Sequence, residues 1–205
     1  MALDLGVLLP AYLTIVVTIF IAELTDKDAL LLLALATKMK PWTAFAAGST
    51  AFTITSAIIV TIGYFLTKVV PIFWVRLAGG IFMIGYAIWD YSQSGVKEEK
   101  EEENRLLNQT KKKTALSIFF GAVSLLILLD LAGDATEVIT IVFVARFSNV
   151  LLVFLGAVTA LVAASALETI LGGRLKKILS PKRLRIFSLL VFLAIGSVII
   201  LTTVF

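Results

Sequence analysis

Apolar residues fill most of the chain in long runs, and short polar breaks separate the runs. The runs are close to the roughly 20 residues that an α-helix needs to cross a bilayer. Proline marks several breaks, as in Lys38-Met-Lys-Pro41 and Ser180-Pro181, because it favours the start of a helix over its interior. The pattern predicts six spans, over residues 12–37, 42–67, 72–92, 116–145, 148–172 and 183–204. We therefore expect an all-α polytopic membrane protein with six transmembrane helices.

A charged stretch, KEEKEEENRLLNQTKKK at residues 97–113, follows the third predicted span. Its high charge and low hydrophobicity are typical of a solvated linker. We expect this linker to divide the chain into two units. Residues 1–96 would form a first three-helix repeat, and residues 114–205 would form a second one.

The two halves also share a spacing between an aspartate and a glycine. Gly48 follows Asp26 by 22 residues, and Gly156 follows Asp134 by 22 residues. An odd number of spans in each half inserts the second copy upside down. The sequence therefore predicts two inverted three-helix repeats, with a site near the membrane midplane where the repeats meet.

Basic residues lie mostly on one side of the predicted membrane. Fourteen of the 18 Lys and Arg residues lie in the linker 97–113 and in the two other connections on its side, and three lie on the opposite side. The positive-inside rule puts the linker in the cytoplasm and both termini outside it. We expect a multi-pass protein of the cell membrane, with the lipid bilayer as a partner and no nucleic acid. A homo-oligomer is left open.

Composition limits the chemistry of the interior. Hydrophobic residues make up 60% of the 205 residues and charged residues 16%, and both cysteine and histidine are absent. Their absence excludes disulfides, thiolate metal sites and Cys or His catalysis. A metal held by side chains must then bind oxygen atoms, which favours hard cations such as Ca²⁺, Mg²⁺ or Mn²⁺.

Apart from Asp90, two residues from the end of the third span, seven acidic residues fall within the predicted spans. They are Glu23, Asp26, Asp28, Asp130, Asp134, Glu137 and Glu168. Each would cost about 2.5–3.5 kcal/mol facing lipid at the bilayer centre, so they must face one another, water or a cation, or be protonated. Asp130, Asp134 and Glu137 stand at i, i+4 and i+7, which is one stripe of a helix. Glu23 and Asp26 stand at i and i+3.

Asp26 and Asp134 lie near mid-depth in their spans and are our central candidates for cation ligands. Glu23 is a further candidate. Glu137 and Glu168 suit cation ligation as well as a proton relay or a structural pair, and Asp130 suits the support of a ligand as well as direct ligation. Hydroxyl groups that fit a secondary polar lining belong to Thr136, Ser49 and Thr53, although hydroxyls within spans often bond their own helix.

Other features near the two key aspartates have simpler explanations. Lys27 follows Glu23 by four residues and is expected to form an ion pair with it. Asp28 is expected at a helix break or at the cytoplasmic water, with direct ligation as the alternative. Thr25 and Gly133 precede the two aspartates, and we expect unwound turns there that expose backbone carbonyls.

Two segments resemble a known signature. AELTDKDALLLLALATK (22–38) is similar to the motif Glu-x-Gly-Asp-Lys/Arg-Thr/Ser, and LAGDATEVITIVFVAR (131–146) is similar to its second copy. The motif belongs to the Golgi and bacterial manganese/calcium–proton exchangers of the LysE superfamily. The resemblance implies an antiporter, not an enzyme, that exports Mn²⁺ or Ca²⁺ from the cytoplasm against protons. It implies no cofactor, and it implies one Glu and one Asp from each repeat around the transported cation.

The chain departs from this signature at four positions. Thr25 replaces the glycine of the first copy, and Asp28 replaces its hydroxyl residue. Leu131 stands where the second copy has glutamate, and Ala135 stands where it has a base. The carboxylate missing at Leu131 then has three candidate substitutes, which are Asp130, Glu137 and Glu168.

Two other functions fit parts of the sequence. The excess of carboxylates would also suit export of a small organic cation or an amino acid, as in related members of the superfamily. Two intramembrane aspartates are also found in intramembrane aspartyl proteases, but Leu131 replaces the first glycine of their Gly-x-Gly-Asp motif and no Pro-Ala-Leu segment follows.

Overall fold

The computed structural model describes residues 5–24, 32, 35–36, 39–92, 115–131, 135–178 and 181–205. Every regular element within these residues is an α-helix, as predicted. The helices are α1 (Leu5–Glu23), α3 (Pro41–Val69), α4 (Ile72–Ser92), α6 (Ala115–Asp130), α7 (Ala135–Phe147), α8 (Val150–Ile178) and α9 (Pro181–Val204).

Five of these helices are long and apolar enough to cross a membrane, namely α1, α3, α4, α8 and α9. These five helices agree with the expected multi-pass membrane protein. The predicted span 72–92 coincides with α4, and the predicted start at residue 42 is one residue from the start of α3. Pro41 occupies the first position of α3, where a missing N–H group costs the helix nothing.

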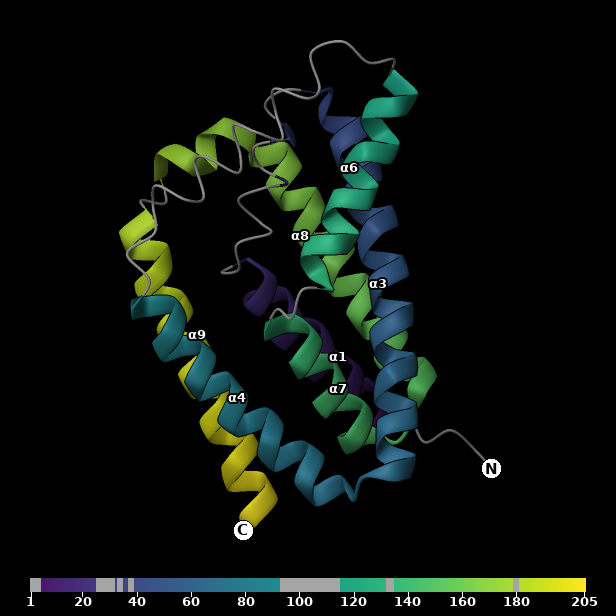
Figure 1. Ribbon diagram of the computed structural model, residues 1–205, viewed down its shortest axis with the longest axis vertical. Helices are drawn as coiled ribbons and strands as arrows, with labels where there is room; N and C mark the ends of the chain where they lie inside the picture. The colour runs from purple at the N-terminus through teal and green to yellow at the C-terminus, as the bar shows by residue number, and fades with distance from the viewer. Residues whose placement is uncertain are drawn as a thin grey trace.

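The predicted fourth span, 116–145, is not one helix. It consists of α6, which ends at Asp130, and α7, which begins at Ala135. The two helices have 16 and 13 residues, so at 1.5 Å per residue neither crosses a hydrocarbon core of about 30 Å alone. In Figure 1 they occupy opposite ends of the same bundle. Gly133, where we expected an unwound turn, lies outside the described residues, so that turn stays a prediction.

The predicted first span, 12–37, also differs from the structure. Helix α1 begins earlier, at Leu5, and ends at Glu23. The amide of Leu24 still donates a hydrogen bond to the Phe20 carbonyl at 3.1 Å, and this bond closes the last turn. Thr25 lies outside the described residues, so the unwound turn expected there stays a prediction.

The helices of the two halves recur at a nearly constant offset. Helices α6, α8 and α9 begin 110, 109 and 109 residues after α1, α3 and α4. Helix α3 packs against α8, its counterpart, and α4 packs against α9. The contact between α1 and α8 has its equivalent in the contact between α3 and α6. If each helix is replaced by its counterpart in the other half, the same helix pairs are in contact.

Glycines allow the closest approaches between helices. A Cβ atom added at Gly156 of α8 would lie 2.6 Å from Ile15 of α1. One added at Gly196 of α9 would lie 2.9 Å from the Gly80 carbonyl oxygen of α4. Small residues at such points let helix backbones come together within a membrane. Figure 1 shows α4 and α9 as a pair beside the remaining helices, and α7 makes the main contact between the pair and the rest.

Candidate functional site

Two helices end on buried acidic residues. Helix α1 ends at Glu23, which is 1% exposed, and α6 ends at Asp130, which is 3% exposed. The C-terminal turn of a helix leaves carbonyl groups without helical partners and carries the negative end of the helix dipole. Each end thus combines a carboxylate with backbone oxygens. Cations are attracted to such ends, and broken helices in transporters bind cations in this way.

The start of α7 lies against the end of α1. Thr136 and Glu137 occupy the first turn of α7 and are 2% and 7% exposed. The Thr136 hydroxyl donates a hydrogen bond to Glu23 Oε2 at 3.3 Å, and this bond joins residues 113 positions apart in the sequence. The structure therefore brings the surroundings of the two sequence motifs into contact in the protein interior.

A small cavity lies beside this contact. Two carboxylates, those of Asp130 and Glu137, line it together with several hydroxyl groups. The remaining lining residues are Thr55, Ser56, Ile59, Thr136, Thr140 and Leu161. Its volume of about 10 Å³ corresponds to one water molecule or a bare ion. Helices α3, α6, α7 and α8 all contribute, so the cavity is an oxygen-rich chamber between both halves of the chain.

Glu168 of α8 is fully buried but does not line this cavity. Among the described residues, neither of its carboxylate oxygens has a hydrogen-bond partner. Ser165 and Thr169, its neighbours on the helix, donate their hydroxyl protons to carbonyls of their own helix at 2.9 and 2.7 Å. Glu168 is therefore a further buried carboxylate, separate from the cavity.

The predicted polar lining is divided. Thr136 lines the cavity, whereas Ser49 and Thr53 do not. The Thr53 hydroxyl donates to the Ser49 carbonyl at 2.7 Å, which is the bond within one helix that we expected for such residues. Thr55 and Thr140 were not predicted as lining residues. Thr140 follows Thr136 by four residues and so falls on the same helix face. This spacing could have identified Thr140 as a lining residue from the sequence.

Four predicted site residues lie outside the described residues: Asp26, Lys27, Asp28 and Asp134. The ion pair between Lys27 and Glu23 and the pairing of the two central aspartates therefore stay predictions. Within the part of the chain that the structure describes, no group of three or more acidic side chains is arranged to hold a metal ion. The described carboxylates alone do not make a complete metal centre.

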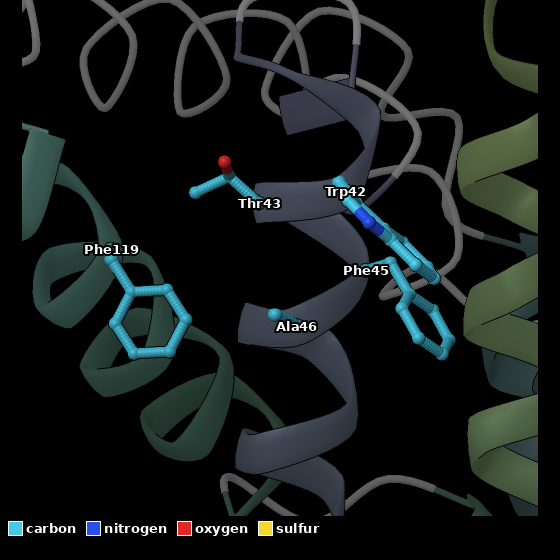
Figure 2. A pocket seen from close by; sticks show the side chains of 5 residues that line it. All are labelled: Trp42, Thr43, Phe45, Ala46 and Phe119. Carbon is cyan, nitrogen blue, oxygen red and sulfur yellow. The ribbon is translucent and has the colours of Figure 1, made fainter.

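A second pocket opens between α3 and α6 and has a volume of about 410 Å³. Figure 2 shows its lining, which consists of Trp42, Thr43, Phe45, Ala46 and Phe119. The rings of Trp42 and Phe45 stack with their centroids 5.3 Å apart. The lining contains no carboxylate, so the pocket does not suit a divalent cation, which binds several oxygen ligands.

Comparison with protein families gives a match over residues 11–97 and 116–204. The matched family is described as the divalent cation/proton antiporter GDT1. The two matched segments fall one in each half and leave out most of the predicted linker. Neither the curated proteins nor the solved structures compared with the chain gave a match. Because the family match covers most of the chain, the resemblance drawn from the two motifs is confirmed, and the chain belongs to the GDT1 family of divalent cation/proton antiporters.

Proposed function

We propose that this protein exports Mn²⁺ or Ca²⁺ from the cytoplasm in exchange for protons, through a carboxylate site near the membrane midplane. The observation that carries the proposal is the contact between Thr136 and Glu23 beside the cavity that Asp130 and Glu137 line. Acidic groups from both halves thus gather where two helix ends add backbone oxygens. Oxygen-rich surroundings of this kind suit Mn²⁺ and Ca²⁺.

Asp26 and Asp134 complete the site in this proposal. Asp26 follows Glu23 by three residues, and Asp134 precedes Thr136 by two. Because two or three residues span only a short distance, we propose that both aspartates bind the cation beside the contact between Glu23 and Thr136. Asp130, which lines the cavity, supplies the carboxylate that the second motif lacks at Leu131.

Exchange follows from competition for the same oxygens. Carboxylates gathered in a medium of low dielectric repel one another, so some of them take up protons when the cation leaves. An arriving divalent cation favours the ionised forms and displaces those protons. Transport results if the site opens to the two sides of the membrane in turn.

Two inverted repeats would provide this alternation. The nearly constant offset between equivalent helices and the exchange of their contacts support such repeats. In this proposal each repeat has a broken first helix, represented by α1 in the first half and by α6 with α7 in the second. Rocking of one repeat against the other would expose the central cavity to each side.

The test is flux in proteoliposomes across a pH gradient. We expect the wild-type protein to carry Mn²⁺ or Ca²⁺ and to carry no amino acid. Asp26→Asn and Asp134→Asn remove one charge each while keeping the side-chain shape, and each should abolish the flux. Elution of the variants as folded protein from a size-exclusion column is the control. Normal flux in either variant would count against the proposed site.

A further inference from the structure

Buried polar atoms continue beyond the central cavity along the interface of α3 and α8. Ser56 Oγ, Ser49 Oγ and both carboxylate oxygens of Glu168 are shielded from solvent and have no hydrogen-bond partner among the described residues. Glu168 is 0% exposed. Burying a carboxylate without donors is costly, so its retention calls for a group that compensates it.

The packing of the two helices places these atoms in order. Ser56 of α3 and Leu161 of α8 line the same cavity. Nearer the start of α3, a Cβ atom added at Gly48 would lie 3.2 Å from the Ser165 hydroxyl oxygen. Residue numbers therefore fall along α3 as they rise along α8, which makes the two helices antiparallel.

Ser49 and Glu168 then lie within about one helical turn of each other along this interface. Ser49 precedes Ser56 by seven residues, and Glu168 follows Leu161 by seven. Seven residues make two helical turns, a rise of about 10.5 Å, and return to the same helix face. Both side chains are thus about two turns from the cavity, toward the end of α3 that begins at Pro41.

We infer that Glu168, with the Ser49 hydroxyl, forms a transit site for the cation between the cytoplasm and the central cavity. The inference rests on the proposed function. It also rests on the predicted topology, in which the start of α3 faces the cytoplasm. A divalent cation compensates the buried carboxylate, and hydroxyl oxygens complete its shell. The Ser165 and Thr169 hydroxyls already donate hydrogen bonds to carbonyls of their own helix, so they do not donate to the Glu168 carboxylate.

Sided transport assays test this inference. Mn²⁺ uptake is measured in membrane vesicles of both orientations, with the cation offered either at the face that carries residues 97–113 or at the opposite face. We expect Glu168→Gln to raise the KM for Mn²⁺ at the linker face at least about tenfold, the effect of losing one charged ligand. The KM at the opposite face should stay unchanged.

Conservative variants and a matched control keep the test decisive. Glu168→Asp should restore part of the affinity at the linker face, because it returns the charge. Ser49→Ala should raise the KM about threefold at that face only, and this expectation holds whether or not Glu168→Gln folds. Thr169→Val is the control, since its hydroxyl already bonds its own helix, and it should leave both faces unchanged.

Three results would overturn the inference. If the wild type transports Mn²⁺ while the Glu168 and Ser49 variants match it at both faces, the transit site is wrong and the proposed function stands. If Glu168→Gln raises the KM for Mn²⁺ equally at both faces, Glu168 acts at the central site and not at a transit site. If the wild type exchanges no divalent cation at either face, the proposed function itself fails.

Discussion

Replacing Thr136 by valine removes one hydroxyl group from the proposed site and keeps the shape of the side chain. Thr136 is 2% exposed, and its hydroxyl donates to Glu23 Oε2 at 3.3 Å. This hydrogen bond connects the end of α1 to the start of α7. We predict that Thr136→Val loosens Glu23 at the site and weakens cation binding.

The size of the effect follows from the bond. A hydrogen bond to a charged acceptor contributes about 1.5–3 kcal/mol. A separation of 3.3 Å exceeds the usual range for two oxygens, so the lower value of about 1.5 kcal/mol applies. Since about 1.4 kcal/mol corresponds to a tenfold change in an equilibrium constant, the KM for Mn²⁺ should rise about tenfold.

The assay is Mn²⁺ flux into proteoliposomes across a pH gradient, measured over a range of Mn²⁺ concentrations. Thr169→Val is the matched control, because Thr169 is buried, does not line this cavity and donates a hydrogen bond to the Ser165 carbonyl at 2.7 Å. We expect the control to keep its KM within about twofold. Equal KM values for the two variants would refute the role of the bond between Thr136 and Glu23.

Three further predictions concern packing and the cavity. Gly196→Ala should lower the free energy of unfolding by about 1–3 kcal/mol, because its Cβ would lie 2.9 Å from a backbone oxygen of α4. Gly85→Ala is the control, because an added Cβ there has no atom within 4 Å, and it should leave the free energy of unfolding unchanged. Thermal melting of both variants in detergent measures the difference. Arg76→Met removes the hydrogen bond of 2.9 Å that the Arg76 side chain donates to the Ala145 carbonyl, and it should lower the melting temperature. An unchanged melting temperature would show that this hydrogen bond does not stabilise the contact between α4 and α7. Asp130→Asn should reduce Mn²⁺ flux at least about tenfold, and full flux would exclude it from the site.

Hydropathy predicts most of the helices well, because length and apolar character decide which segments cross a bilayer. It fails at the helix break between α6 and α7. Long apolar stretches continue on both sides of that break, so the average hydropathy stays high through it although Asp130, Asp134 and Glu137 lie there. Gly133 was the residue from which we expected an interruption. Helix α1 begins before Pro10 because proline is tolerated in membrane helices when neighbouring groups satisfy the backbone.

The site is predictable in composition but not in arrangement. Charge in an apolar span predicts an inward-facing residue, and Glu23, Asp130 and Glu137 are all buried. The separation of Glu168 from the cavity depends on how α8 is rotated and shifted against α3. Packing between helices sets that relation, and the periodicity of a single helix does not contain it.

The central claim is that Asp26 and Asp134 serve one shared cation site. The most direct measurement is equilibrium binding of Mn²⁺ to the purified protein, with the bound Mn²⁺ and the released protons counted together. We predict that Asp26→Asn and Asp134→Asn each abolish both quantities and that the double variant behaves like either single one. Half of the bound Mn²⁺ remaining in each single variant, with the rest lost only in the double variant, would show two independent sites and contradict the account.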